Sequence, residues 1–289
     1  MKYTLNTTLS SLTSFKIGGR CKSVIFPENG EDVKKITDYM REHGEKYYIL
    51  GNGTNVLFSD EGFDGHIISC TEMTEITVDE ENTVVTAGAG VNITLLAHKV
   101  SKMGYEGLEF AYGIPGSVGG GVYMNAGAYG YELAPIIKSV EYFDIDCGEV
   151  KRIAREKIEF GYRKSSFMKM NGVILSAEFS LEKGSAEKSL ALCDEYMRRR
   201  KEKQPLEYPS AGSVFKRCVG HFTGEMIEKC GLKGYRIGGA EVSEKHAGFI
   251  INRGGATASD VLLLISHIKE TVNKAYGVSL ECEVRVVGE

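Results

Sequence analysis

Short apolar runs alternate with amphipathic stretches through the first third of the chain. The apolar runs 23–26 and 47–50 predict strands. Between them, residues 32–43 carry apolar side chains at helical spacing, and Gly44 follows as a helix stop. This order of elements predicts that the chain begins with an α/β or α+β arrangement.

The same reading extends along the rest of the chain. It predicts further strands at 65–69, 75–78, 83–87, 139–143 and 173–181, and helices at 94–103, from about 185 to near Pro205, at 225–230 and at 259–276. Gly104 is expected to end the helix 94–103. The helix 259–276 has the clearest end signals, because Thr257 and Asp260 are spaced as a capping box and Gly277 follows its last residue.

The glycine-dense segment 113–130 and the C-terminal segment 279–287 complete the prediction. We expect 113–130 to be a loop, because glycine destabilises helices and strands. In 279–287 apolar residues occupy every second position, which predicts a terminal strand with one polar face.

Proline 205 marks the expected domain boundary, because proline cannot continue the preceding helix. At roughly 150 residues per domain, the 289 residues favour two domains. We therefore expect an N-terminal region 1–204, with α+β subdomains at about 1–65 and 66–204, and a smaller α+β domain at 205–289.

Composition and charge exclude several classes of protein. A net charge of −4 is unlike the basic field of a nucleic-acid binder. No apolar run approaches the ~18 residues of a membrane span, and the N-terminus lacks the apolar core of a signal peptide. We expect a cytoplasmic, monomeric enzyme with no nucleic-acid or membrane partner.

Cysteine usage predicts neither a disulfide framework nor a metal site. The 7 cysteines are an odd number, widely spread, and none forms a C-x-x-C motif. Cys218 and His221 are the nearest approach to a metal pair, and two ligands do not make a zinc site.

Glycine is the compositional outlier, with 35 of 289 residues, against only 5 prolines. Two dense clusters, at 51–55 and 113–121, allow the backbone to turn tightly and to approach a diphosphate with converging N–H groups. Val56 breaks the G-x-G-x-x-G fingerprint in the first, and the second has no G-K-[ST] ending. Either cluster alone could serve tight turns only; together with 124–130 they favour one extended dinucleotide site outside the Rossmann and P-loop classes.

Five ordered segments carry a family resemblance. They are LGNGTNVLFSDEGFDG (50–65), EFAYGIPGSVGGGVYMNAGAYG (109–130), GYRKSSF (161–167), YPSAGSVFK (208–216) and LECEVRVVG (280–288). In this order, and across nearly the whole chain, they resemble the UDP-N-acetylenolpyruvoylglucosamine reductases. The resemblance implies a two-lobed FAD-binding region of the vanillyl-alcohol-oxidase-like (PCMH) type and a smaller C-terminal substrate domain.

The resemblance also implies the reaction and its catalytic residues. NADPH reduces non-covalent FAD, whose N5 passes hydride to an enolpyruvyl ether of a UDP-sugar, giving UDP-N-acetylmuramate for peptidoglycan. Arg163 matches the arginine that stabilises the enolate, Glu283 a glutamate that assists it, and Ser213 the proton donor. From the residues alone each could be an ordinary surface or turn residue; the flanking motifs favour catalysis.

Binding residues follow from the same segments. For FAD we expect Gly51, Asn52, Gly53, Thr54, Asn55, Val56, Gly113, Pro115, Gly116, Ser117, Gly120, Asn125 and Gly127. For the UDP-sugar we expect Arg199, Lys203 and Arg217, since a diphosphate needs cations. We expect His246 to be structural. Cys218 and Cys282 stand where the family pattern leads us to expect proline, and the shorter 163–213 spacing resembles the class without an inserted tyrosine loop.

Two alternatives stay open at this point. One is an FAD oxidase of the same superfamily; many of these tether flavin through a histidine or cysteine, which 51–56 and 113–121 lack. The other is a non-catalytic nucleotide-binding module. Reoxidation of reduced flavin by air distinguishes the first, and a colourless protein would indicate the second.

Overall fold

The computed structural model describes residues 1–218, 220 and 222–288. Its described residues form two compact units, each built from separate stretches of chain. Unit 1 contains 1–4, 23–52 and 65–200; unit 2 contains 5–22, 53–64 and 201–289. The domain boundary expected at residue 204 stays a prediction. Unit 2 is built from three separate stretches of the chain.

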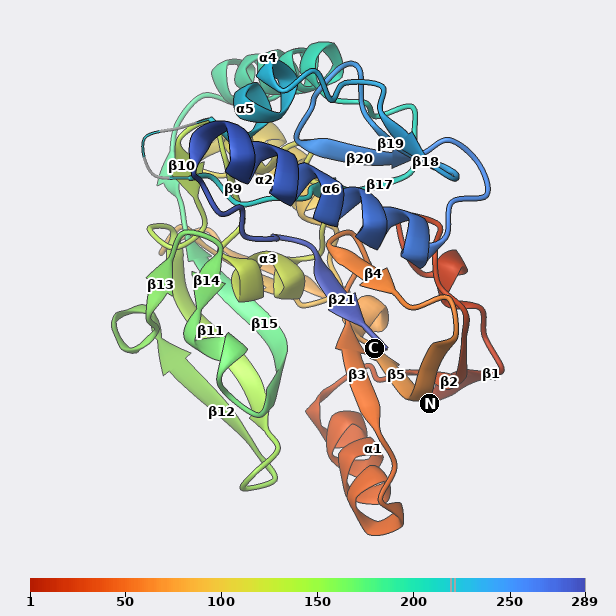
Figure 1. Cartoon of the computed structure of the whole chain (residues 1–289). Coiled ribbons are helices and arrows are strands. Elements are labelled where there is room, and N and C mark those ends of the chain that lie inside the picture. The colour runs from red at the N-terminus through yellow and green to blue at the C-terminus, as the bar shows by residue number, and fades with distance from the viewer. Residues whose placement is uncertain (219, 221, 289) are drawn as a thin grey trace. The chain divides into compact units, whose positions relative to one another are not determined.

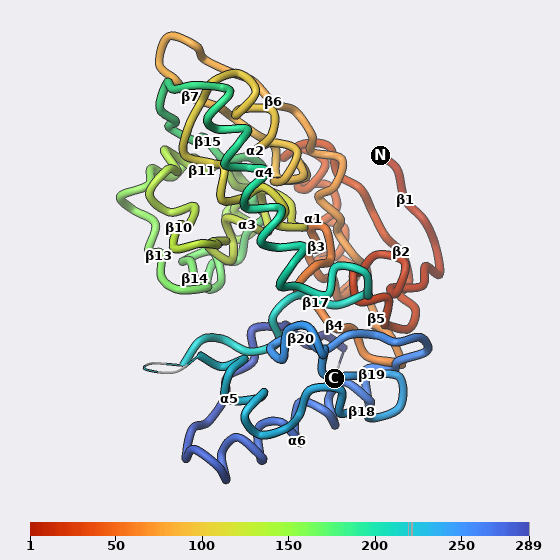
Figure 2. Tube along the Cα trace, turned by 90° about the horizontal axis from the view of Figure 1, so that it is seen from above, coloured from red at the N-terminus to blue at the C-terminus, as the bar shows by residue number. Residues whose placement is uncertain are grey.

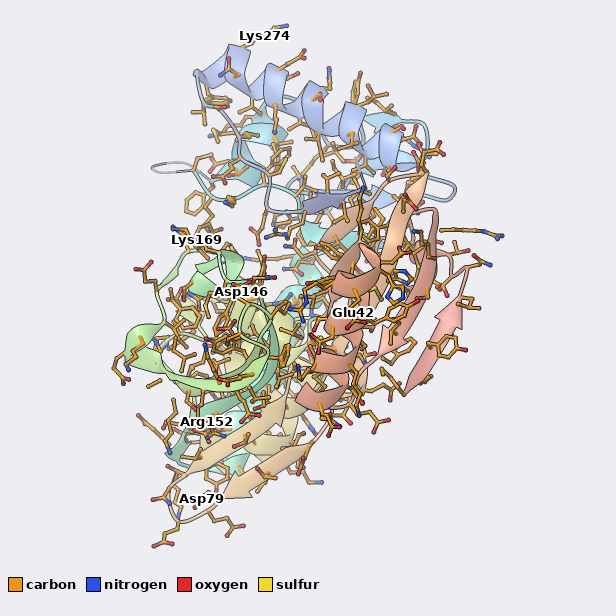
Figure 3. The ribbon with its side chains drawn as sticks, turned by 90° about the horizontal axis from the view of Figure 1, so that it is seen from below. Glu42, Asp79, Asp146, Arg152, Lys169 and Lys274 are labelled. Carbon is orange, nitrogen blue, oxygen red and sulfur yellow. The ribbon has the colours of Figure 1, made fainter. Side chains whose placement is uncertain are left out.

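Unit 1 contains a five-stranded sheet in the order β12-β11-β15-β7-β6, of which Figure 1 labels β11, β12 and β15. Its strands are β6 (Ile76–Asp79), β7 (Val84–Gly88), β11 (Ile137–Asp144), β12 (Glu149–Ala154) and β15 (Gly172–Ser180), and every pair is antiparallel. The predicted strands 139–143 and 173–181 are confirmed. Arg152 of β12, labelled in Figure 3, makes ion pairs with Glu141 of β11 and Glu178 of β15.

Helices contribute to the apolar core of this sheet. Helix α3 (Val118–Met124) packs against β7 and β15, and α1 (Gly30–His43) packs against β11. Side chains of α2 (Ile93–Lys102) and Tyr196 of α4 (Ala186–Lys203) belong to the same core. Asn29 caps α1 by accepting from the Asp32 N–H at 3.0 Å, and left-handed Gly44 ends it as predicted. Met103, rather than Gly104, is the C-cap of α2, with left-handed Gly104 following.

Further strands lie in the first two thirds of the chain. They are β1 (Lys2–Leu5), β2 (Arg20–Phe26), β3 (Tyr47–Leu50), β5 (Gly62–Ser69), β8 (Tyr105–Glu106), β9 (Gly127–Ala128), β10 (Tyr131–Glu132), β13 (Phe160–Gly161), β14 (Lys164–Ser165) and β16 (Glu182–Lys183). Strands β1, β2, β5 and β3 form a sheet in that order, and β3 pairs with β5 in parallel. Figure 2 shows β6 and β7 as a hairpin, at whose turn Asp79 lies in Figure 3.

Unit 2 is built around a four-stranded sheet in the order β17-β20-β19-β18, with α6 packed against β18 and β19 (Figure 1). Its elements are β4 (Val56–Phe58), β17 (Ser210–Ser213), α5 (Thr223–Lys229), β18 (Arg236–Ile237), β19 (Ala240–Val242), β20 (Phe249–Asn252), α6 (Ala258–Tyr276) and β21 (Arg285–Val287). The capping box of Thr257 and Asp260 and left-handed Gly277 are confirmed.

Two predictions about local structure are wrong. Segment 113–130 contains the helix α3, whose three glycines allow tight packing: a Cβ at Gly119 would lie 2.8 Å from the Ala89 Cβ. The predicted strand 279–287 is regular only at Arg285–Val287, because the chain changes partner before it. Residues 281–283 hydrogen-bond to 214–216, and β21 then pairs in parallel with β4.

Short 3₁₀ segments lie at 9–11, 70–72, 109–111, 155–157 and 166–168. Among the described residues, no helix is both long and apolar enough to cross a membrane.

Candidate active-site residues and cofactor loops

The two glycine clusters approach each other in unit 1. A Cβ at Gly51 would lie 2.5 Å from the Ser117 Oγ, which is closer than real Cβ contacts allow. Ser117 is buried, and its Oγ accepts from the Gly120 N–H at 3.3 Å. Asn52 continues the first cluster in unit 1 and is half-buried. The structure therefore brings the clusters together, as one extended site requires.

The second cluster is held by main-chain hydrogen bonds to the segment before and within α2. The Val118 N–H donates to the Val91 carbonyl, and the Gly116 carbonyl accepts from the Ile93 N–H at 3.0 Å. The Gly113 N–H donates to the Thr94 Oγ1 at 3.1 Å, and Pro115 is exposed. These contacts fix the path of a glycine-rich backbone that has little intrinsic stiffness.

Gly113 lies beside a buried arginine that sequence reasoning missed. Its φ is 90°, and a Cβ there would lie 3.1 Å from both the Cδ and the Nε of Arg200. Burial lowers the pKa of Arg200, and its hydrogen bond to Tyr129 opposes that effect. Helical spacing could have revealed it, because the buried residues of α4 recur at Cys193, Tyr196 and Arg200.

The remaining residues of the first cluster lie in unit 2. Gly53 has a φ of 62°, and a Cβ there would collide with the Leu12 carbonyl oxygen, so glycine is required. Thr54 is half-buried, and Val56 begins β4 opposite Arg285. The side chain of Asn55 is the notable one: its Nδ2 donates to the Glu283 carbonyl at 3.2 Å.

Ser213 and Glu283 lie on neighbouring segments of unit 2. Val214, the residue after Ser213, accepts the Glu283 N–H at 2.7 Å. Phe215 and Cys282 form an antiparallel bridge, and Lys216 makes an ion pair with Glu281. Both Ser213 and Glu283 keep part of their surface accessible. The segments that carry two of the three predicted catalytic residues are thus hydrogen-bonded to each other.

Arg163 lies at the turn of the β13–β14 hairpin in unit 1. Gly161 pairs with Lys164, so Tyr162 and Arg163 form a two-residue turn, and Arg163 has a φ of 52°. Its Nη2 donates to the Gly127 carbonyl at 3.1 Å, and its guanidinium lies over the Tyr162 ring. A long side chain in a left-handed conformation is costly, which is typical of a functional position.

Asn125 and Gly127 adjoin that hairpin. Asn125 is fully buried, with its Nδ2 donating to the Gly161 carbonyl at 3.0 Å and its Oδ1 accepting from the Ala134 N–H at 3.0 Å. Gly127 accepts from Arg163 through its carbonyl. The segment predicted to bind the cofactor thus also contacts the hairpin of the predicted catalytic arginine.

The predicted substrate cations are exposed. Arg199 makes an ion pair with Glu195 one turn earlier in α4, at 2.6 Å. Lys203, the last residue of α4, and Arg217 are also exposed. Their roles toward a UDP-sugar stay predictions.

Two remaining expectations concern histidines. His221 lies outside the described residues, so its pairing with Cys218 is not described; among the residues that are described, no three His, Cys, Asp or Glu side chains gather as a metal site. His246 accepts the Gly248 N–H at its Nδ1, packs edge-on against Phe249, and burial lowers its pKa. Both contacts agree with a structural role.

Comparison with known proteins identifies the family. Residues 21–154 match the model of the FAD binding domain, and 204–287 match that of the UDP-N-acetylenolpyruvoylglucosamine reductase C-terminal domain. The reductase of Lachnoclostridium phytofermentans is 45% identical, covering 100% of this chain and 94% of its own, and that of Pediococcus pentosaceus is 46% identical, covering 97% and 93%.

A solved structure gives the same result. The UDP-N-acetylenolpyruvylglucosamine reductase from Thermus caldophilus superposes with a TM-score of 0.84 at 34% identity, covering 99% of this chain and 98% of that one. The predicted fold, an FAD-binding region followed by a smaller C-terminal domain, is confirmed. This chain belongs to the family of UDP-N-acetylenolpyruvoylglucosamine reductases, which are FAD-dependent oxidoreductases.

Proposed function

We propose that this protein reduces the enolpyruvyl ether of UDP-N-acetylglucosamine to UDP-N-acetylmuramate, a precursor of peptidoglycan, with NADPH as reductant. The observation that carries the proposal is the pairing of the Ser213 and Glu283 segments, in which Val214 accepts the Glu283 N–H at 2.7 Å. The two segments that carry the Ser213 hydroxyl and the Glu283 carboxyl are thereby paired through their backbones. Family membership supports this assignment.

FAD fits the glycine clusters on structural grounds. The Gly51 and Gly119 positions have no room for a Cβ, so the backbone there comes closer to its neighbours than any other residue would allow. When bound, FAD supplies the transfer of hydride from NADPH to the unsaturated carbon of the ether. We assign its binding to the residues of 51–56 and 113–120 named above, with Asn125 and Gly127. No histidine or cysteine in 51–56 or 113–121 could tether it covalently.

Arg163 acts on the charge that develops in the substrate. Addition of hydride to the enolpyruvyl group places negative charge on its carboxylate side as an enolate. A guanidinium stays protonated and can donate two parallel hydrogen bonds to a carboxylate. Arg163 therefore stabilises the enolate, and its fixed place at the hairpin turn spares reorganisation during the reaction.

Ser213 and Glu283 complete the reaction. The enolate must receive a proton on its α-carbon, and the Ser213 hydroxyl is the donor. A serine is a weak acid in water, but a carbanion is basic enough to accept its proton when the two are aligned. Glu283 assists from the adjacent segment by stabilising the intermediate.

The proposal also covers the binding of the UDP diphosphate, the roles of the two domains and the location of the enzyme. Arg199, Lys203 and Arg217 bind the UDP diphosphate by charge. Residues 1–204 bind FAD and 205–289 bind the substrate. The protein works as a cytoplasmic monomer without nucleic acid or membrane partners, in keeping with its net charge of −4.

An anaerobic titration tests the proposal. The purified protein should show a flavin spectrum that NADPH bleaches and that the enolpyruvyl substrate restores, with one equivalent of product formed. If reduced protein ignores the substrate but reoxidises rapidly in air, the protein is an oxidase of the same superfamily. Acid precipitation should release the flavin into the supernatant; colour kept in the pellet would contradict non-covalent binding.

A further inference from the structure

Three side-chain hydrogen bonds join the end of α3 to the β13–β14 hairpin within unit 1. Asn125 Nδ2 donates to the Gly161 carbonyl at 3.0 Å, and Ser165 Oγ donates to the Tyr123 carbonyl at 2.7 Å. In the third bond, Arg163 Nη2 donates to the Gly127 carbonyl at 3.1 Å. Asn125 and Ser165 are both fully buried, so water does not compete for their bonds.

Asn125 is held at both ends of its amide. It is the C-cap of α3, in a left-handed conformation with φ 46° and ψ 62°, which asparagine tolerates better than most residues. Its Oδ1 accepts from the Ala134 N–H at 3.0 Å while its Nδ2 donates to Gly161. An aspartate of the same shape would keep the acceptor and lose the donor.

The hairpin that Asn125 contacts carries a strained residue. Arg163 follows Gly161 by two positions and has a φ of 52° in the two-residue turn. A left-handed non-glycine residue costs about 1–3 kcal/mol and persists only where its surroundings determine the conformation. The bond to the Gly161 carbonyl fixes one end of that turn, and the Gly127 carbonyl holds the guanidinium.

We infer that Asn125 is a positioning residue for Arg163: it holds the turn at Gly161 so that the guanidinium stays directed toward the substrate carboxylate. This inference rests on the proposed function, which makes Arg163 catalytic. It assigns to the buried amide a task in substrate reduction that is separate from holding FAD.

A double-mutant cycle tests the inference. Asn125→Asp removes the donor to Gly161, and Asn125→Gly removes the whole amide while suiting the left-handed backbone. Each is made in the wild-type chain and in Arg163→Ala. Stopped-flow absorbance follows reduction by NADPH and reoxidation by the enolpyruvyl substrate separately, and titration of the apoprotein measures FAD affinity.

We expect either Asn125 variant to slow reoxidation by about 10²-fold, the size of effect that a small misplacement of a catalytic group produces. In the Arg163→Ala background the same change should alter reoxidation less than about twofold, because residues acting as one unit are not additive. Because Asn125 is also assigned to FAD binding, both half-reactions are measured at saturating FAD, where reduction by NADPH should stay close to wild type. Thr37→Val, which loses a buried hydrogen bond to the Val33 carbonyl in α1, is the matched control and should leave both half-reactions unchanged.

Three results would overturn the inference. Equal losses in both backgrounds would show that Asn125 does not act through Arg163. A loss of FAD affinity with wild-type reoxidation at saturating FAD would make Asn125 a cofactor ligand only, and unchanged reoxidation in both Asn125 variants without such a loss would leave it with neither role. If Arg163→Ala alone reoxidises at the wild-type rate, the proposed function of Arg163 fails, which is a separate outcome.

Discussion

The side-chain amide of Asn55 donates a hydrogen bond to the main-chain carbonyl of Glu283 at 3.2 Å. The Arg285 N–H donates to the Asn55 carbonyl at 3.1 Å, so Asn55 bonds to the terminal segment on both sides of Val284. A residue of the first glycine cluster thus fixes the backbone of a proposed catalytic carboxyl. Asn55, which we propose binds the cofactor, therefore also holds the backbone at Glu283.

We expect Asn55→Ala to slow substrate-dependent reoxidation by about tenfold or more, because Glu283 loses a backbone anchor. Reduction by NADPH should change less, since Glu283 acts on the substrate. Asn82→Ala is the control: it removes a hydrogen bond to Asp79 at 2.8 Å in an exposed turn and should leave both rates unchanged. Equal slowing of the two half-reactions in Asn55→Ala would place its effect on the flavin rather than on Glu283.

Arg163 offers a test of strain against activity. Arg163→Ala and Arg163→Gly should both lower substrate turnover by about 10²–10³, the usual effect of losing one group that stabilises an oxyanion. Arg163→Gly should nevertheless unfold at higher denaturant concentration than Arg163→Ala, since glycine accepts a φ of 52° without strain. Urea melts of the two variants provide the comparison. Equal midpoints would show that the turn stores no strain at this residue.

Ser213→Ala separates the two half-reactions. The variant should bind FAD and be reduced by NADPH at nearly the normal rate, whereas reoxidation by the enolpyruvyl substrate should become very slow without the proton donor. Anaerobic stopped-flow absorbance follows each half. Loss of the NADPH half, or reoxidation at the wild-type rate, would remove Ser213 from its assigned role.

Asp260 makes stability depend on pH. The Thr257 and Gly239 N–H groups donate to its carboxylate at 3.0 and 3.1 Å, and they hold its pKa below the ordinary 3.8. A lowered pKa in the folded state stabilises the protein above the unfolded-state pKa, and this contribution is lost as the pH falls through the folded value. Asp260→Asn should therefore be less stable than wild type at neutral pH, with a smaller difference near about pH 3. Urea midpoints at the two pH values measure it; a constant gap would contradict the argument.

The sequence predicted well those helices whose first and last residues carry capping signals. Helix α6 begins with the capping box of Thr257 and Asp260 and ends at Gly277, where the sequence placed it. Helix α3 was missed because three consecutive glycines have poor helix propensity. Its stability comes from contacts distant in sequence, such as the close packing of Gly119 on Ala89.

In the candidate site, too, local motifs predicted some features, whereas contacts between distant segments could not be predicted. Motifs identified Arg163, Ser213 and Glu283 as candidates, and the structure explains how Ser213 and Glu283 come together through Val214. The bonds of Asn125 to Gly161 and of Asn55 to Glu283 could not be predicted, because each joins segments that no local pattern relates. Their side chains were expected only at the cofactor.

The parallel pairing of β4 with β21 constrains the order in which the protein can fold. Val56 lies opposite Arg285, so β4 acquires this partner only after more than two hundred further residues have been translated. Such long-range pairing raises contact order and slows folding. The side chains of Leu57 and Phe58 are buried in the folded protein. Until β21 is available they lack its cover, and β4 can aggregate through its unpaired edge. Removal of residues 285–287 should thus lower soluble yield before it affects chemistry.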